Sequence, residues 1–436
     1  MYKISSLKAR TGSADQKLEP EEDFKRTEFH YGIILVRTKR FQSIMDRLGA
    51  RKISKPVGWV LLYLMPVAAA FGFYLFLSEA AILLSARGAE VASYVRTLGP
   101  LANLGLPGIN PYIPVVYGWI ALIVAMVIHE GAHGVVARSL GLPVKASGLL
   151  FVLFVPIGAF VDVDETAIKQ AKPSHSGRVL AAGAGINLVV GLVCLLILVG
   201  MVGSFAPAVS GAGIITVAPG APAATAGIMP GDFITQMNGR NITDIGSVIG
   251  PNTTLKAGQT VNLTVYRDGR ILHFSVQLAC CYVVENLRTR QNTTYPYIGV
   301  GQVTGTELVS YVSMYAAPLS NLWQYVCIPT IPQCQTRVPF SDTLAGFYTS
   351  PLGSAAPPLA NLVYWLFFIN FNLAIFNALP IYPLDGGQAF AVGVKALGKG
   401  KLSEGAQMRI TALATLTVVA LLLGVIAGPY LLPYLP

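Results

Sequence analysis

The sequence carries two histidines four positions apart, with a glutamate directly after the first. His129, Glu130 and His133 lie in the segment Ile-His-Glu-Gly-Ala-His-Gly. On a helix, side chains four residues apart share one face, so the two imidazoles can bind one zinc ion. The glutamate is then placed to act as general base for a water molecule that the metal activates. This spacing predicts a zinc-dependent hydrolytic centre, which still requires a third protein ligand.

The motif lies at the end of an apolar stretch that begins near Tyr112. Ionisable residues within a membrane span are energetically costly, which makes them functional candidates. The chain has only five histidines, so a chance H-E-x-x-H is rare. The alternative is a helix end whose polar side chains extend to the membrane surface. That alternative has to explain His129, Glu130 and His133 separately.

The composition is that of a protein that crosses a membrane several times. Of the 436 residues, 53% are hydrophobic and 12% are charged, and the mean hydropathy is +0.58. A soluble globular protein has about 25% charged residues, and a membrane helix needs about 20 mostly apolar residues. The segments that meet this length are roughly 57–79, 112–134, 179–203, 357–380 and 410–432. We therefore expect a polytopic α-helical membrane protein with about five to six transmembrane helices.

A further apolar stretch, Leu149 to Val161, is too short to span a bilayer as a helix. Turn residues flank it, so we expect a strand pair or a re-entrant hairpin associated with the membrane. Such a hairpin is allowed at membrane depth only where protein or water satisfies its backbone.

The net charge of +10 does not indicate a nucleic-acid partner, because the basic residues lie mostly beside the apolar segments. They are frequent before the first segment and between the second and third, whereas the loop between the first and second has only Arg87 and Arg96. The positive-inside rule then predicts a cytoplasmic N-terminus and an outer C-terminus, with the lipid bilayer as a partner. Residues 1–25 are polar and are expected to be disordered.

A long polar insertion, residues 204–350, separates the third and fourth apolar segments, and the same topology places it outside the cell. It contains four N-x-S/T sequons, at Asn241, Asn252, Asn262 and Asn292. It also contains four of the five cysteines, Cys280, Cys281, Cys327 and Cys334. Both features suit an exported, oxidising location. Coincidental sequons and free buried thiols remain the alternatives, and four cysteines allow three pairings.

Within the insertion, residues 213–278 resemble a PDZ domain of the kind found in bacterial and archaeal membrane proteases. The resemblance rests on 217–243 and 255–278, where the turns Pro219-Gly220 and Pro230-Gly231 flank a short helix at 221–226. A strand at 261–265 then enters a hairpin turn at 267–270. PDZ domains bind peptide ends by strand addition, and a β-rich spacer without a ligand is the alternative. Residues 295–303 are read as one more strand, and 307–326 as an amphipathic helix.

Asp385 is the best candidate for the third ligand. It follows the fourth apolar segment and lies between Pro383 and Gly386, where a helix must break. Such a break lets a carboxylate enter a polar cavity. In the predicted topology the second and fourth segments run in the same direction, so Asp385 reaches the depth of His129 and His133. The alternative is a helix cap at the membrane interface.

These paired motifs resemble those of the site-2 protease family of intramembrane zinc metalloproteases. That family combines H-E-x-x-H on one span with N-x-x-P-x-x-x-x-D-G on a later one, and this chain has Asn377, Pro380, Asp385 and Gly386 at that spacing. The resemblance covers 112–138, 178–203, 357–390, the hairpin and the PDZ-like insert, about two thirds of the chain. One departure is that many relatives have Gly-Pro before an Asn in the third core span, whereas this chain has Gly183-Ala184 before Asn187.

The resemblance implies a zinc metalloendopeptidase that cleaves transmembrane segments of membrane-protein substrates, as in regulated intramembrane proteolysis. One Zn²⁺ per chain would be held by His129, His133 and Asp385, with Glu130 as the catalytic base. Asn377 and Asn187 are the candidates for contacts with the substrate or the oxyanion. Two other classes are a metal transporter, which needs ligands spread along a path, and a catalytically silent scaffold that binds peptides through the PDZ-like domain.

The expected organisation has five parts. Residues 1–56 form a cytoplasmic basic region, 57–203 the first part of the membrane region, 204–280 an extracytoplasmic PDZ-like α+β domain, 281–356 an extracytoplasmic extension, and 357–436 the second part of the membrane region.

Overall fold

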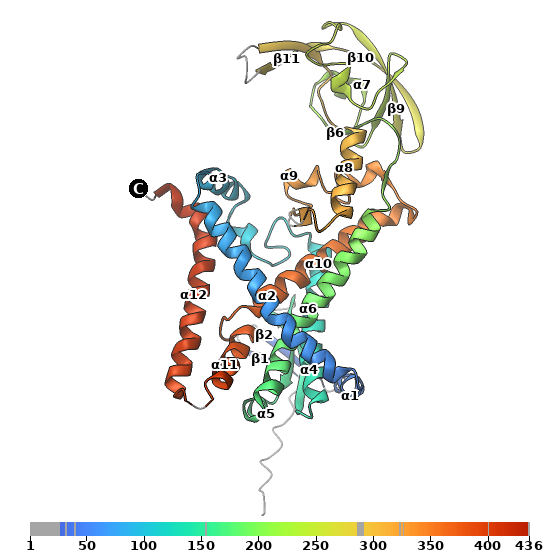
Figure 1. Cartoon of the computed structure of the whole chain (residues 1–436). Coiled ribbons are helices and arrows are strands. Elements are labelled where there is room, and N and C mark those ends of the chain that lie inside the picture. The colour runs from blue at the N-terminus through green and yellow to red at the C-terminus, as the bar shows by residue number, and fades with distance from the viewer. Residues whose placement is uncertain are drawn as a thin grey trace, which may run out of the picture.

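The computed structural model describes residues 27–30, 33–38, 41–152, 155–285, 292–321, 324–325, 327–399 and 401–434. The segment expected to be disordered, 1–25, lies outside this range. The described chain forms a bundle of long helices with a β domain at one end, and a layer of short elements lies between the two (Figure 1).

Five helices are long and apolar enough to cross a membrane, which confirms the polytopic helical prediction. They are α2 (Ser54–Leu83), α4 (Val115–Ser139), α6 (Pro173–Val202), α10 (Ala356–Ala378) and α12 (Glu404–Leu431). Helix α6 packs against α2, α4 and α10. Its buried face contains small residues such as Ala181, Ala182 and Ala184, which let neighbouring backbones approach closely.

Two short helices mark one end of the bundle, α1 (Gln42–Gly49) and α5 (Glu165–Gln170). We call this the α1 end and the opposite end, toward the large β domain, the sheet end. The second halves of α4 and α10 both approach the α1 end, as does the beginning of α6 (Figure 1). Helix α3 (Gly88–Leu98) and the 3-10 turn η1 (Pro100–Asn103) lie at the sheet end.

A four-stranded antiparallel sheet lies against α4, with the order β1-β2-β3-β4. Its strands are β1 (Thr27–His30), β2 (Ile33–Thr38), β3 (Val144–Val152) and β4 (Val155–Val163). The predicted hairpin is β3 and β4, each longer than expected. Strands β1 and β2 were not predicted. Because β4 is an edge strand of this sheet, one row of its backbone groups has no partner strand.

The six-stranded sheet of the insertion has the order β10-β9-β7-β6-β13, with β8 paired to β7. Its strands are β6 (Ala212–Val217), β7 (Phe233–Met237), β8 (Arg240–Asn241), β9 (Thr260–Arg267), β10 (Arg270–Gln277) and β13 (Val300–Val303). Helix α7 (Pro222–Ala226) lies where a short helix was expected. The β9–β10 turn was also expected, and Asp268 and Gly269 both have positive φ there.

The segment expected to form one strand, 295–303, contains two. Strand β12 (Asn292–Tyr297) pairs with β11 (Ala279–Glu285), whereas β13 joins the six-stranded sheet. That sheet therefore extends beyond residue 280, the expected end of the PDZ-like domain.

A layer of short elements connects the six-stranded sheet to the spans. Helix α8 (Gly305–Ala316) begins at a capping box between Thr304 and Glu307, and it ends earlier than the helix expected over 307–326. A disulfide joins Cys327 to Cys334, while Cys194 in α6 is free.

The other described helices and strands of the chain are short, apart from α11. They are β5 (Ala206–Pro207), η2 (Ile245–Ser247), α9 (Pro332–Gln335), η4 (Ala345–Phe347), β14 (Tyr348–Thr349), η5 (Gly353–Ala355), α11 (Asp385–Leu397) and η6 (Leu432–Tyr434).

Candidate metal centre

The structure brings His129, His133 and Asp385 together, although the second and third are 252 positions apart in the sequence. The Nε2 atom of His129 lies 3.0 Å from Oδ2 of Asp385, and the Nε2 atom of His133 lies 3.1 Å from the same oxygen. One potential ligand atom from each residue falls within 4.8 Å of the others. Both histidines are buried, at 7% and 9% exposure. The three side chains form a compact group that could hold a metal ion.

Helix α4 places the two histidines, and a break between α10 and α11 places the carboxylate. Helix α10 ends at Ala378, and Asp385 is the first residue of α11. The chain turns sharply between α10 and α11, and Gly386 packs against the end of α10. An added Cβ there would lie 2.3 Å from the carbonyl oxygens of Ala378 and Leu379. Glycine is therefore required beside Asp385, because any side chain would push α11 away from the end of α10.

The hydrogen bonds behind the two imidazoles leave their Nε2 atoms free for a metal. Nδ1 of His133 lies 2.7 Å from the carbonyl oxygen of Val179, so this nitrogen carries the proton. Nδ1 of His129 lies 3.2 Å from the amide nitrogen of Asn187. The amide oxygen of Asn187 is buried without a partner. If the amide oxygen and nitrogen are exchanged, that oxygen accepts a hydrogen bond from the Nδ1–H of His129. Each imidazole then directs an Nε2 lone pair at Asp385.

Two neutral imidazoles and one carboxylate form a donor set that zinc binds in catalytic sites. Lone pairs of Nε2 and Oδ2 that face one another repel, and a cation between them removes that repulsion. When Nδ1 of His129 carries the proton, the amide oxygen of Asn187 also gains a hydrogen-bond donor. The residues of the centre therefore fit a zinc ion.

The centre opens into a cavity of about 280 Å³. Its walls come from α4, β4, α10 and the start of α11, and they include both Glu130 and Asn377. The lining residues are Met126, His129, Glu130, Ala159, Leu373, Asn377, Pro383, Leu384 and Asp385. The carboxylate of Glu130 accepts a hydrogen bond of 2.9 Å from the backbone N–H of Val161 in β4. The Glu130 carboxylate, the three candidate metal ligands and a sheet edge thus meet at one small space.

The six site residues expected from the sequence occupy three kinds of position. His129, His133 and Asp385 form the ligand group, the three side chains that could hold a metal ion. Glu130 and Asn377 line the cavity beside it. Asn187 lies behind His129, fully buried, and contacts the ring instead of the open cavity.

Three features of the centre were not predicted. The Val179 carbonyl and the Val161 N–H are backbone groups, which carry no sequence signal. Gly183 is the third, since an added Cβ would lie 2.4 Å from the Nε2 atoms of both histidines. The run of small residues around it in α6 was a usable signal of close approach.

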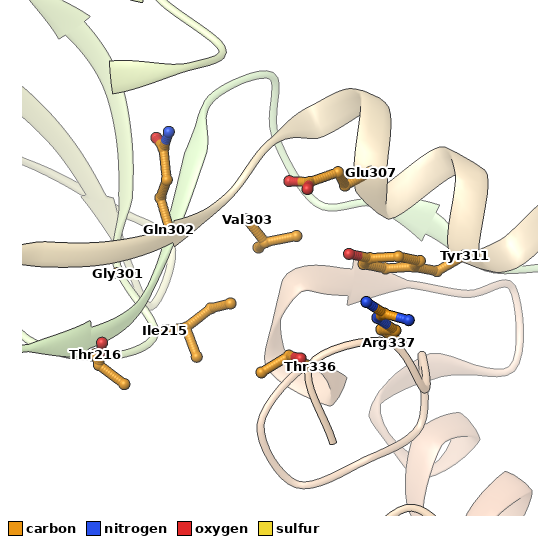
Figure 2. Close-up of a pocket in the computed structure, with 9 residues that line it drawn as sticks. All are labelled: Ile215, Thr216, Gly301, Gln302, Val303, Glu307, Tyr311, Thr336 and Arg337. Atoms are coloured by element: carbon orange, nitrogen blue, oxygen red, sulfur yellow. The ribbon is translucent and has the colours of Figure 1, made fainter. Parts of the chain in front are cut away.

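A second cavity, of about 370 Å³, lies outside the spans between the six-stranded sheet and α8 (Figure 2). Its lining residues are Ile215, Thr216, Gly301, Gln302, Val303, Glu307, Tyr311, Thr336 and Arg337. The one carboxylate in its wall, Glu307, accepts hydrogen bonds from the N–H and hydroxyl groups of Thr304. The carboxylate is engaged in capping α8, and the nine lining residues include no second carboxylate, histidine or cysteine.

Replacing Asn187 tests its contact with His129. We expect Asn187→Leu to lower the zinc affinity of the purified protein about 10- to 100-fold, because the Nδ1–H of His129 loses its acceptor. Competition with a chromophoric chelator measures this affinity. Asn370→Leu is the matched control, because Asn370 is equally buried but donates to a carbonyl of its own helix. An unchanged affinity in Asn187→Leu would show that the amide does not orient the ring.

Comparisons with known proteins agree with this chemistry. The model of peptidase family M50 matches residues 117–424, well over half of the chain. The MJ0971 protein of Methanocaldococcus jannaschii is 26% identical over 353 residues, which cover 81% of this chain and 75% of that protein. The "Regulator of sigma-W protease RasP" of Bacillus subtilis is 27% identical over 184 residues, or 41% of each chain.

A third relative, named "Putative zinc metalloprotease", comes from Mesorhizobium japonicum. It is 23% identical over 337 residues, which cover 65% of this chain and 89% of that protein. Together with the five apolar helices, these matches make the protein an integral, multi-pass membrane metalloprotease. Family membership also implies zinc, a lipid bilayer and membrane-protein substrates. The chain belongs to peptidase family M50, the site-2 protease family.

Proposed function

We propose that the protein is an intramembrane zinc metalloendopeptidase that cleaves the transmembrane segments of membrane-protein substrates. One observation supports this proposal more strongly than the others. The ligand group and the carboxylate of Glu130 share a single cavity whose walls are built by two of the candidate spans, α4 and α10. A peptide bond that reaches this cavity would be within the membrane region of the protein.

In this proposal His129, His133 and Asp385 hold one zinc ion per chain. The ion supplies Lewis acidity toward the scissile carbonyl and toward the attacking water. Glu130 removes the proton from that water and then delivers it to the amide nitrogen of the departing segment. Its hydrogen bond from Val161 orients the carboxylate over the cavity.

The two asparagines have different tasks. Asn377 lines the cavity, so its amide can donate to the carbonyl oxygen of the substrate as negative charge develops there. Asn187 is a positioning residue, because it contacts His129 and no part of the open cavity.

A helical substrate hides its peptide bonds in i to i−4 hydrogen bonds, so it must unwind before hydrolysis. The edge of β4 that has no partner strand offers the unwound segment a surface to pair with. Ala159 of β4 lines the cavity, and Val161 two residues later directs its N–H at Glu130. An extended substrate strand paired with this edge would pass directly beside the base.

The six-stranded sheet is proposed to be a PDZ-like domain that binds peptide ends, and we place it outside the cell with its extension. The N-terminus and the metal centre are then on the cytoplasmic side. The basic residues near the α1 end support this orientation through the positive-inside rule. The match of α7 and of the β9–β10 hairpin to the expected PDZ elements supports the domain assignment.

Metal removal tests the proposed activity. The protein is reconstituted into lipid vesicles with a tagged single-span substrate, and the cleaved product is quantified on gels. We expect 1,10-phenanthroline to lower the rate by at least about 100-fold, because the Lewis acid is lost. Added zinc should then restore it. A transporter or a silent scaffold would give no cleavage under any of these conditions, and cleavage that resists the chelator would contradict a metal-dependent reaction.

A further inference from the structure

A group of basic side chains lies at the α1 end, where α2 and α6 begin. Lys55 is in the first turn of α2, Lys172 is the N-cap of α6, and His175 and Arg178 follow within α6. The starts of the two helices are in contact here, because Cδ of Arg178 lies 3.5 Å from the position of a Cβ built at Gly58, which follows Lys55 by three residues on α2. Within the described ranges, none of the three cations forms an ion pair with a carboxylate.

Arg178 is the most informative member of this group, because it is only 6% exposed. Its Nε donates to the carbonyl oxygen of Ser174 at 3.0 Å, and its guanidinium lies 4.8 Å from the ring centre of Trp59. A buried cation is costly unless an anion or a π face compensates its lost hydration. The ring of Trp59 compensates in part, and a bound anion would compensate more fully.

The surroundings of the group indicate what kind of anion binds. Trp59 and Tyr63 stack on one another one turn apart on α2, with ring centres 6.0 Å apart. They are 40% and 67% exposed on the surface of a candidate span, where lipid chains would contact them. A ligand that touches both the cations and these rings must combine a negative head with a hydrocarbon body.

We propose that Lys55, Lys172 and Arg178 bind the headgroup phosphate of an anionic phospholipid, with an acyl chain along Trp59 and Tyr63. Basic pockets between membrane helices bind such headgroups by charge attraction. This site is separate from the cavity that contains Glu130.

The proposed lipid site is adjacent to the metal centre, both in sequence and in space. Arg178 precedes Val179, whose carbonyl accepts the hydrogen bond from Nδ1 of His133. Val136 of α4, one turn after His133, and Arg178 both lie beside Gly58 of α2. An occupied lipid site would fix the start of α6, and with it the carbonyl that orients His133. This inference goes beyond the proposed proteolysis and can be tested without it.

The native Trp59 reports on the site directly. The full chain is reconstituted in nanodiscs of phosphatidylcholine that contain brominated phosphatidylglycerol or, separately, brominated phosphatidylcholine. The signal of Trp59 is the fluorescence lost in a Trp59→Phe variant, which removes the contribution of the other three tryptophans. We expect the anionic lipid to quench Trp59 at a lower mole fraction than the zwitterionic lipid does.

The preference should fall about five-fold for each lysine removed in Lys55→Gln and Lys172→Gln. The matched control, Lys395→Gln with Lys399→Gln, removes two exposed cations from α11 and the turn after it and should leave the preference intact. Equal quenching by both lipids, or a preference that survives the loss of Lys55 and Lys172, would overturn the proposal. Inorganic phosphate that abolishes the preference for the anionic lipid would also overturn it, because the site would then bind the free anion.

Discussion

Glu130→Gln should reduce cleavage of a single-span substrate by about 10²- to 10⁴-fold, the range that a positioned general base contributes. The amide has the shape of the carboxylate and can still accept the N–H of Val161. It cannot accept a proton from the attacking water at neutral pH. The fold and the zinc content of the variant should therefore match those of the wild type, while the initial rate in proteoliposomes falls.

Two measurements keep this result interpretable. Zinc content is determined on the same preparation, since a loss of metal would explain the inactivity in another way. Glu79→Gln is the matched control, because Glu79 is a glutamate of another span, α2, and does not line the cavity. If Glu130→Gln keeps a rate within a few-fold of the wild type, Glu130 is not the base.

Gly183→Ala should disrupt the metal centre by steric overlap alone, without any change of charge or polarity. The added methyl carbon would lie 2.4 Å from the Nε2 atoms of His129 and His133, far inside van der Waals contact. Either the imidazoles turn away or α6 moves outward, and both changes separate the ring nitrogens from Asp385. A displacement of about 1 Å at a catalytic centre costs roughly 10²-fold in rate. We expect at least that loss in cleavage, together with weaker zinc binding.

The control for this variant lies on the same helix. Gly200 of α6 has no atom within 4 Å of an added Cβ, so Gly200→Ala should keep both rate and zinc affinity and should favour the helix slightly. Wild-type zinc affinity in Gly183→Ala would show that the two histidines are not held against α6 in the way the structure places them.

Much of the ligand group could be predicted from local signals. His129 and His133 share a helix, so their spacing alone places them on one face. Asp385 was identifiable because few acidic residues occur near the apolar segments, and because Pro383 and Gly386 break the helix on either side. The alternating direction of the spans predicted that Asp385 would lie level with the two histidines, and the structure brings the three side chains together. These inferences need no knowledge of side-chain packing.

The remaining features depend on contacts that a linear pattern does not contain. Strand β2 pairs with β3, more than a hundred residues later, and β1 pairs with β2. Strand β13 joins β6 across more than eighty residues, so the limit of the sheet is set by tertiary pairing. The groups that orient His133 and Glu130 are main-chain atoms of Val179 and Val161. Every residue has such atoms, and only the fold selects which of them are used.

The central claim, that His129, His133 and Asp385 hold a catalytic zinc, is tested most directly by X-ray absorption at the zinc edge. The measurement is made on the purified full chain and on Asp385→Asn, with the metal content of each sample determined in parallel. We predict one zinc per wild-type chain with two imidazole nitrogens among its ligands, and a marked loss of zinc in Asp385→Asn. A wild-type chain that binds no zinc, or an Asp385→Asn variant with unchanged zinc content and spectrum, would contradict the account.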